Sequence, residues 1–532
     1  MDMDVLVSLA VVVGAAAVGG VLARMLRLPA LVGYLGAGMA LNMAGVGSGG
    51  LWSELGKVGV TFLLFLVGLE LPINDLRKYG KTALLTGSAQ IGITSIIGFG
   101  LARWLGFGFT EAVYLGVALT FSSTIVVVNV LSAKKELDSL HGRIAVGSLL
   151  VQDFAALGML MVMTGWGSGG GWVQAAFLAV KGLILVAGTL VLAETVLPKI
   201  MAWMARSVEG LYVFSLAWCL GVAAVVGSRT VGFSVEIGGL LAGLALAAGA
   251  QRLEIMARIR PLRDFFMVLF FVSLGAGLGW GGLGQWWWPG LIMAGYVIVG
   301  NPVIMMIILT ALGYGRRTAF LAGLTMGQIS EFSLVVAAAA VATGLVGPQV
   351  LGVVTVVGVI SMTVCSLAMT YAKELYTRVG RYLPGKKSEK RVKVSKDFGH
   401  VILFGHNRTG SAVRPVLEKM GKKVLVVDFN PMIVDKLKGE GVDVVYGDLA
   451  DAEIYDGLGL DRADLVISTV SDVQDNLLLL EKLKQNVKRK VVVTAGDDQE
   501  ARELYNAGAD FVLVPHRVGG EYLAHLLERN MI

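Results

Sequence analysis

The sequence predicts a polytopic α-helical membrane domain followed by a cytoplasmic α/β domain, and three observations lead to this fold class. The 532-residue chain is 55% hydrophobic and only 16% charged, whereas ordinary soluble proteins have about 25% charged residues. Long apolar stretches fill the chain as far as residue 372. Beyond it, short apolar strands alternate with helical stretches at the charge density of a soluble domain. We therefore expect a membrane domain at 1–372, a basic linker at 373–398 and an α/β domain at 399–532.

The membrane domain is predicted from apolar stretches long enough to cross about 30 Å of hydrocarbon. Thirteen spans are expected, although several are short or interrupted by glycine and the count is open by one. They lie at residues 5–25, 30–46, 55–72, 83–103, 112–133, 143–163, 172–197, 211–227, 231–250, 265–282, 287–311, 318–341 and 350–372. No cleavable signal sequence is evident, so the first span is expected to stay as an anchor.

The charges between the spans predict the orientation. With thirteen helices and a cytoplasmic C-terminus, sixteen of the twenty Lys and Arg residues before residue 373 fall on cytoplasmic loops. Only Lys57, Arg103, Lys181 and Arg229 fall outside. The positive-inside rule therefore favours an N-terminus outside and a cytoplasmic C-terminal domain.

The cysteines and the net charge exclude several classes of protein. Cys219 and Cys365 lie in apolar spans without metal-ligand spacing, so neither a disulfide framework nor a tightly bound metal is expected. The net charge of +6 mostly reflects the cytoplasmic loops. No nucleic-acid surface is expected.

One acid stands out inside the membrane domain. Asp153 follows Gln152 in an apolar run, and an intramembrane acid usually lines a water-filled ion path because burying its charge costs several kcal/mol. A proton and a cation such as K⁺ or Na⁺ can compete for this carboxylate, while Gln152 offers a neutral carbonyl ligand. If only an occupied site crosses the membrane, exchange follows, and a single acid predicts one cation per proton. The alternative is an Asp held by a buried partner such as Arg143 or a backbone amide.

Spans five and twelve share a pattern of small and hydroxyl residues in the middle of the membrane. Leu119-Thr-Phe-Ser-Ser-Thr-Ile125 resembles Leu324-Thr-Met-Gly-Gln-Ile-Ser-Glu331. Their offset of seven spans gives opposite chain directions, as inverted-topology repeats require, and such repeats build ion sites from broken helices. We expect Glu331 to support the crossing of the half-helices or to sense protons, rather than to bind the transported ion. Hydroxyls that bond back to their own helix are the alternative.

The hydroxyls at the break in span five are candidate oxygen ligands for the cation. We expect Ser122, Ser123 and Thr124 to line the site, with Thr120 as a weaker candidate. Asn129 lies about one turn beyond them and is assigned a supporting role. Helix packing is the alternative explanation for these side chains.

Several stretches carry a resemblance to a known family. They lie at residues 68–71, 121–143, 147–153, 260–266, 270–275 and 327–333. Together they resemble Kef-type members of the monovalent cation:proton antiporter-2 family. The resemblance implies a thirteen-helix transporter, not an enzyme, that exchanges K⁺ for H⁺ in the lipid of a bacterial inner membrane. It also implies a mobile core of crossed broken helices and a homodimer through both domains. Glutathione control is not carried over, because residues 248–255 lack the acidic loop of the glutathione-gated relatives.

The C-terminal domain is predicted to contain a parallel, doubly wound, Rossmann-like sheet. Short apolar strands are separated by helical stretches, which favours parallel strands joined by crossover helices. The strands are expected at residues 400–404, 423–428, 442–447, 465–469, 490–494 and 511–514. The final helical stretch at 521–528 is expected to pair subunits.

The first turn of this domain occupies the dinucleotide-fingerprint position. Its candidate nucleotide-binding residues are Gly405, His406, Asn407, Arg408, Thr409 and Gly410. Asn407 replaces the middle glycine that lets the backbone approach a pyrophosphate, which counts against a full dinucleotide site. Arg408 could meet a phosphate at the start of the helix. Asp428 ends the second strand, where an acid bonds ribose hydroxyls and would repel a 2′-phosphate.

The soluble domain also resembles the TrkA-N-like regulatory domain that controls potassium conductance in bacterial transporters and channels. That resemblance implies that Asp448 and Thr469 contact the nucleotide. AMP or another adenine nucleotide is therefore expected, with NAD(H) left open and NADP disfavoured. The alternative is a degenerate fold kept for dimerisation alone.

Three functions compete on these observations. The first is a potassium/proton antiporter regulated by nucleotide binding, and the second is a sodium/proton antiporter on the same scaffold. The third is a membrane-anchored NAD-dependent oxidoreductase, which is weak because no acid/base constellation or second substrate domain follows the nucleotide fold. A potassium channel is disfavoured because no Thr-Val-Gly-Tyr-Gly filter occurs.

Overall fold

The computed structural model describes residues 5–529 with gaps. The gaps are residues 27–29, 46–49, 71–72, 135, 138, 167–170, 206, 229–230, 232, 234, 248, 250, 343, 381–399, 407, 450–451, 456–457 and 484–489. The chain forms two compact units. The first comprises Met1–Ile308 with Phe320–Arg378, and the second comprises Leu309–Ala319 with Val379–Ile532.

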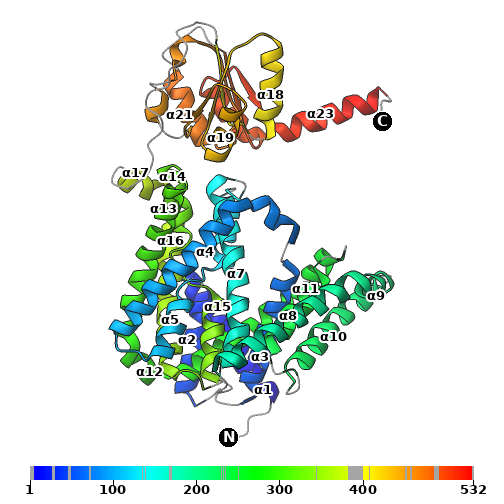
Figure 1. Cartoon of the computed structure of the whole chain (residues 1–532), viewed down its shortest axis with the longest axis vertical. Coiled ribbons are helices and arrows are strands. Elements are labelled where there is room, and N and C mark those ends of the chain that lie inside the picture. The colour runs from blue at the N-terminus through cyan, green and yellow to red at the C-terminus, as the bar shows by residue number, and fades with distance from the viewer. Residues whose placement is uncertain are drawn as a thin grey trace. The chain divides into compact units, whose positions relative to one another are not determined.

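The helices before the sheet are α1 Val5–Met25, α2 Ala30–Met43, α3 Gly50–Glu70, α4 Ile73–Trp104, α5 Phe109–Ala118, α6 Thr124–Ala133, α7 Leu140–Trp166, α8 Gly171–Thr195, α9 Leu197–Met204, α10 Val208–Val226, α11 Val235–Leu246, α12 Arg252–Gly295, the π-helix Tyr296–Gly300, α13 Asn301–Ala311, α14 Arg316–Leu324, α15 Glu331–Ala342, α16 Pro348–Thr370 and α17 Ala372–Val379. Figure 1 shows the first unit as an all-helical bundle, coloured from blue to green. Most of the linker expected at 373–398 lies outside the described residues, but its first residues form α17.

The length and hydropathy of the helices agree with a membrane domain. Among the described residues, five helices are long and apolar enough to cross a membrane, and a sixth candidate is the bent pair Val180–Thr195 and Leu197–Met204. Several further apolar helices, including α2, α5 and α15, are shorter. The count of thirteen spans stays a prediction.

Two expected spans differ from the observed backbone. The sequence predicts a break between the spans at 265–282 and 287–311. In the structure, α12 and the π-helix continue without a non-helical break into α13. Hydropathy marks where apolar residues stop, but helical backbone hydrogen bonds need not stop there. By contrast, the expected spans 112–133 and 318–341 are each interrupted, as predicted for broken helices.

Small residues let the helices of the first unit approach one another closely. A Cβ added at Gly243 of α11 would lie 2.0 Å from the backbone oxygen of Phe65 in α3. A Cβ at Gly68 of α3 would lie 2.4 Å from the backbone oxygen of Leu240. Such close backbone contact is typical of membrane helices, whose association depends on van der Waals packing.

The second unit contains a six-stranded sheet in which all strand pairs are parallel. The strands are β1 His400–Phe404, β2 Val424–Asp428, β3 Val444–Tyr446, β4 Ala463–Ser468, β5 Lys490–Thr494 and β6 Phe511–Leu513. Their order is β3-β2-β1-β4-β5-β6, which is the doubly wound order. The predicted fold class is thus confirmed, and the predicted strand boundaries agree to within two residues.

The helices of the second unit cover its sheet and extend from it. They are α18 Arg408–Lys419, α19 Pro431–Gly439, α20 Ala452–Tyr455, α21 Val473–Leu483, α22 Asp498–Asn506 and α23 Pro515–Glu528. Two separate apolar clusters line the sheet, one containing Ile402 and Phe404 and the other Val401 and Leu403. Because successive strand residues point to opposite faces, both faces are buried. Figure 1 shows α23 projecting away from the sheet, and no residue of this helix is buried.

Candidate functional site

The first broken helix lies between α5 and α6. Helix α5 ends at Ala118, and α6 begins at Thr124, with residues 121–123 outside regular structure. The Ser123 hydroxyl caps α6 by accepting a hydrogen bond from the Val126 backbone N–H at 3.3 Å. A serine at this position satisfies one of the N–H groups that a helix start leaves unpaired. The sequence-predicted hydroxyls therefore sit at a true helix end.

The second broken helix lies between α14 and α15, and it meets the first. The Ser330 backbone N–H donates to the backbone oxygen of Phe121 at 2.7 Å. The Ser333 hydroxyl donates to the backbone oxygen of Ala118 at 2.7 Å, and the Ser122 hydroxyl donates to that of Met326 at 3.3 Å. These bonds satisfy backbone groups that neither half-helix can pair by itself, as the interior of a membrane requires.

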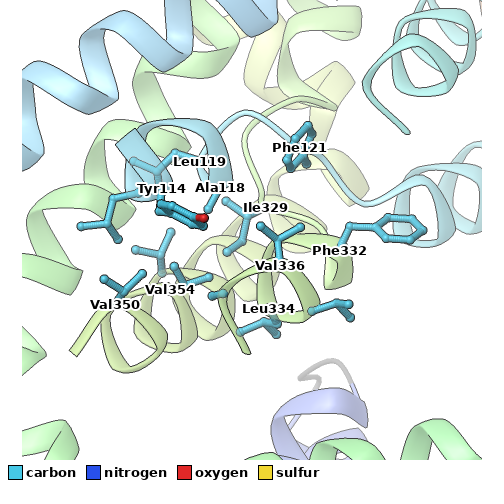
Figure 2. Packing of buried hydrophobic residues seen from close by; sticks show 14 of the residues in the cluster. Tyr114, Ala118, Leu119, Phe121, Ile329, Phe332, Leu334, Val336, Val350 and Val354 are labelled. Atoms are coloured by element: carbon cyan, nitrogen blue, oxygen red, sulfur yellow. The ribbon is translucent and has the colours of Figure 1, made fainter. Parts of the chain in front are cut away.

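Apolar packing holds the crossing in place. Leu119 and Phe121 from the first break belong to the same apolar cluster as Ile329 from the second and Val350 and Val354 of α16, and Figure 2 labels all five. All five side chains are buried. The two breaks are therefore joined by apolar packing as well as by hydrogen bonds.

Asp153 lies on α7 beside the first break. Its side chain is only 6% exposed, and its Oδ2 accepts a hydrogen bond from the Thr124 hydroxyl at 2.9 Å. The neighbouring Gln152 is fully buried, and its Oε1 accepts from the Ser122 backbone N–H at 2.9 Å. Gln152 thereby ties α7 to the break, while a carbonyl oxygen keeps a second lone pair for another partner.

Glu331 is the first residue of α15 and lies at the crossing. Its carboxylate accepts hydrogen bonds from the Ser123 hydroxyl at 3.0 and 3.1 Å and from the Ser330 hydroxyl at 3.4 Å. A carboxylate in the first turn of a helix also interacts favourably with the helix dipole. The supporting role expected of Glu331 stays a prediction.

Two predicted residues contribute less to this arrangement. The Thr120 hydroxyl donates back to the backbone oxygen of Val117 in the preceding helix α5 at 2.7 Å. Asn129 is exposed on α6. For Thr120 the structure therefore shows the self-bonding hydroxyl that was the alternative reading of the sequence.

A buried polar network missed by the sequence analysis supports the end of α5. The Asn301 side-chain amide donates to the backbone oxygen of Leu119 at 2.9 Å. The Thr94 hydroxyl donates to Asn301 Oδ1 at 3.2 Å, and Gln90 Nε2 donates to the Asn301 backbone oxygen at 3.3 Å. Asn301 thus caps a carbonyl freed by the helix break. The signal was present in the sequence, because these three polar residues interrupt the apolar spans 83–103 and 287–311.

The second unit has a glycine-lined loop at the carboxyl end of β1. Gly405 has a φ of +84°, a region that favours glycine. A Cβ at Gly410 would lie 2.0 Å from the Gly405 backbone oxygen. The Thr469 hydroxyl donates to the backbone oxygens of Phe404 and Gly405, both at 3.1 Å, so Thr469 holds the loop against β4.

Asp428 ends β2 beside this loop. It is 3% exposed, and its two oxygens accept from the backbone N–H groups of His406 at 2.7 Å and Asn430 at 2.8 Å. Burial raises the pKa of Asp428, although both backbone hydrogen bonds oppose the shift. Burial and the neighbouring Arg414 lower the pKa of His406. Since Arg414 Nε donates to His406 Nε2 at 3.1 Å, that nitrogen accepts and the neutral ring carries its proton on Nδ1.

The remaining nucleotide candidates are placed at the same edge or lie outside the described side chains. Thr409 is half-buried in α18, and Asp448 follows β3 and pairs with Arg317 at 3.5 Å. Asn407 lies outside the described residues, as does the side chain of Arg408. The loop between Gly405 and Gly410 leaves space that a Cβ would fill, which fits a phosphate. The buried Asp428 at the end of β2 fits the ribose of a nucleotide.

The first unit thus defines a class of protein. Crossed broken helices that meet beside a buried carboxylate are the architecture of secondary ion transporters. The chain belongs to the sodium/hydrogen exchanger family, because the transmembrane sodium/hydrogen exchanger model matches residues 11–372. The TrkA-N domain model matches residues 401–515.

Two relatives resemble the chain over almost its whole length. It is 28% identical to the putative cation/proton antiporter YbaL of Escherichia coli (strain K12), over 96% of this chain and 94% of the relative. It is 27% identical to the glutathione-regulated potassium-efflux system protein KefC of Salmonella typhimurium, over 97% of this chain and 83% of the relative. The resemblance found in the sequence is confirmed, and the chain is a cation/proton antiporter with a TrkA-N domain.

A solved structure supports the membrane fold. The sodium proton antiporter MjNhaP1 of Methanocaldococcus jannaschii aligns with a TM-score of 0.53 at 16% identity. The alignment covers 69% of this chain and all of that chain. At this level of identity the likeness shows the fold of the antiporter domain.

Proposed function

We propose that the chain exchanges K⁺ for H⁺ by alternating access at Asp153 and that a nucleotide bound to the C-terminal domain regulates the exchange. The observation that carries this proposal is the place of Asp153. It is an acid buried in the membrane unit, bonded to Thr124 at the first residue of a broken helix. Intramembrane acids in such positions mark ion pathways.

The contacts at the crossing suggest how one site could serve both ions. The Thr124 hydroxyl bonds the carboxylate, and the Gln152 side-chain carbonyl is a second neutral oxygen group at the same helix break, where it accepts from Ser122. On one side of the membrane a cation displaces the proton from Asp153, and on the other side a proton displaces the cation. The occupied carboxylate is neutralised in both states, whereas an empty, ionised one is costly to move through hydrocarbon. One carboxylate then gives an exchange of one cation for one proton.

Potassium is favoured as the cation by the relatives rather than by the ligands. The relative KefC is named as a potassium-efflux system, and the resemblance of the motifs points the same way. Sodium/proton exchange is the second candidate, because the matched family model is named for sodium. Selectivity depends on the number and flexibility of oxygen ligands rather than on their residue types.

Three further proposals concern the setting of the site. The nucleotide is an adenine nucleotide such as AMP, supported by the glycine loop and by Asp428. The chain forms a homodimer, supported by the exposed Val518, Tyr522 and Leu523 on α23. It lies in a bacterial inner membrane with its N-terminus outside, as the distribution of Lys and Arg indicates.

Antiport in proteoliposomes with an internal pH dye tests the transport site. The protein is supplied with K⁺, Na⁺, Rb⁺ or Li⁺, and the wild type is compared with Asp153→Asn. Asparagine keeps the size of the side chain but cannot exchange a proton, so antiport is expected to fall to the level of empty vesicles. Glu209→Gln removes an acid from an exposed helix start in α10 and should transport like the wild type.

The outcomes separate the parts of the proposal. Antiport that survives in Asp153→Asn would sink the site assignment. Exchange with Na⁺ but not K⁺ would transfer the proposal to the second candidate. A rate that responds to membrane voltage would contradict exchange of one cation for one proton.

A further inference from the structure

A short segment between two predicted spans belongs to the unit that contains the sheet. Residues Leu309–Ala319 group with Val379–Ile532 rather than with the rest of the preceding helices. At its centre, the Gly315 backbone bonds the Tyr446 hydroxyl at the end of β3. A Cβ at Gly315 would lie 2.7 Å from that hydroxyl, so glycine allows this close approach.

Arg317 in the same segment reaches two carboxylates. Its Nη1 and Nη2 each lie 3.3 Å from an oxygen of Asp475, and Nη1 lies 3.5 Å from Asp448 Oδ2. The side chains of Arg317, Asp448 and Asp475 are 21%, 23% and 12% exposed. A planar guanidinium that contacts a carboxylate through its two terminal nitrogens, Nη1 and Nη2, makes a specific, charge-assisted contact. We refer to these ion pairs as the Arg317 latch.

The latch lies at the carboxyl edge of the sheet. Asp448 follows Gly447, whose backbone N–H bonds the backbone oxygen of Asp428 at the end of β2 at 3.0 Å. Asp475 lies in the first turn of α21, which follows β4. In the strand order, β2 and β1 lie between β3 and β4. The two acids thus flank the stretch of edge where doubly wound sheets bind ligands.

We propose that Arg317 is an internal competitor of the nucleotide, holding Asp448 until a bound nucleotide takes that carboxylate over and thereby loosens the segment 309–319, which Asp475 still contacts. This inference rests on the proposed nucleotide site. The amino and hydroxyl groups of a nucleoside are N–H and O–H donors, and Asp448 is the acceptor predicted for them. The guanidinium lies on Oδ2 of Asp448, so a nucleoside donor that takes this oxygen competes with Arg317 for it.

Competition has a reciprocal consequence. If the latch weakens nucleotide binding, nucleotide binding weakens the latch by the same factor. Because the segment joins α13 to α14, and α14 leads to the break before Glu331, release of the latch would carry the state of the nucleotide site to the transport core. That is the regulatory step that the proposed function requires.

Adenosine binding to the purified full-length protein tests the competition by calorimetry. Adenosine has no phosphate, so the change of charge in Arg317→Gln does not act on a ligand charge. We expect Arg317→Gln to bind adenosine about tenfold more tightly than the wild type, a coupling within the usual range. Arg502→Gln makes the same change of charge at an exposed position of α22 and should stay within about twofold of the wild type. Unchanged or weaker adenosine binding in Arg317→Gln would overturn the proposal.

Hydrogen exchange in the wild-type protein gives a test that needs no variant. Saturating AMP is expected to speed amide exchange across residues 309–319, because the segment loses its contact with Asp448. Slower exchange there would mean that Arg317 helps to hold the nucleotide, which contradicts competition. If AMP binds and Arg317→Gln behaves like the wild type, only the latch fails. If neither protein binds AMP or adenosine, the proposed nucleotide site fails and the latch fails with it.

Discussion

The helix crossing and the carboxyl edge of the sheet both bring acids close to the ends of regular elements, but they hold those acids differently. At the crossing, hydroxyl groups donate to Asp153 and Glu331. At the sheet edge, the guanidinium of Arg317 meets Asp448 and Asp475. A neutral donor leaves a carboxylate able to exchange a proton for a cation, whereas a full positive charge competes with any other cationic or donor partner. In the function proposed above, the crossing exchanges ions and the sheet edge is switched.

The largest expected effect is the difference in antiport between variants of the two acids of the crossing. Asp153→Asn should abolish antiport, whereas Glu331→Gln should not. Glu331→Gln keeps an oxygen that can accept from Ser123, so we expect antiport to persist within about tenfold of the wild-type rate, a loss of about 1.4 kcal/mol at most. Glu331→Ala removes that acceptor from a buried site, which should destabilise the protein by about 1–3 kcal/mol. The dye assay in proteoliposomes and the unfolding midpoint in detergent measure the two effects. A Gln variant as inactive as Asp153→Asn would make Glu331 a second ion-carrying acid.

The next effect concerns the glycine loop of the sheet edge. In Gly410→Ala the new Cβ would meet the Gly405 backbone oxygen, and overpacking of this kind costs about 1–3 kcal/mol. We expect AMP affinity to fall about tenfold or more, since each factor of ten corresponds to about 1.4 kcal/mol. Gly439→Ala is the matched control, because nothing lies within 4 Å of its added Cβ. Equal AMP binding by both variants would place the nucleotide away from this loop.

The sequence predicted the parts of both regions that depend on local patterns. Polar residues in an apolar span stand out, so Asp153, Ser123 and Thr124 could be found without a structure. The strands of the sheet were equally visible, because apolar runs between turns have few other interpretations. The pairing of Arg317 with Asp475 could not be found, since the two residues are 158 positions apart and charged side chains are ordinary outside the membrane. Partner choice between such charges is decided by tertiary packing.

The network of Gln90, Thr94 and Asn301 could be predicted only in part from the sequence. Each residue was detectable as polar within an apolar span. Their common target, the carbonyl of Leu119, became identifiable only when the end of α5 was located. The sequence can therefore flag a buried polar residue, but it does not show which backbone group that residue satisfies.

A smaller effect concerns the pH dependence of the latch. Burial raises the pKa of Asp475 from 3.8 to about 6; Arg317 opposes this shift, while Asp472 and Asp448 add to it. Asp475 is therefore charged and paired above pH 6 and increasingly neutral below it. The ratio of adenosine affinities between Arg317→Gln and the wild type should be about tenfold at pH 7.5 and narrow to about threefold at pH 5. Titration of Asp428 and His406 affects both proteins alike and cancels in the ratio.

Calorimetry at a series of pH values measures this ratio. A ratio that stays constant across the range would show that Asp475 does not control the latch, and Asp448 would then carry it alone. A ratio that widens as the pH falls would contradict the assignment of the raised pKa to the paired acid.

The smallest expected effect is on the apparent affinity for K⁺ when the neutral donor to Asp153, the Thr124 hydroxyl, is removed. Thr124→Val keeps the shape of the side chain but removes the hydroxyl that donates to Asp153. A hydrogen bond to a charged group is worth about 1.5–3 kcal/mol, but water in an open site can replace part of it. We therefore expect the apparent affinity for K⁺ to fall about fivefold, roughly 1 kcal/mol, and Thr124→Ser to restore it. Thr363→Val is the control, because the Thr363 hydroxyl bonds the Val359 backbone oxygen in its own helix. If Thr124→Val lowers the maximal rate and leaves the affinity unchanged, the hydroxyl acts on the movement of the half-helices, and the crossing would resemble the sheet edge in being a switch as well as a site.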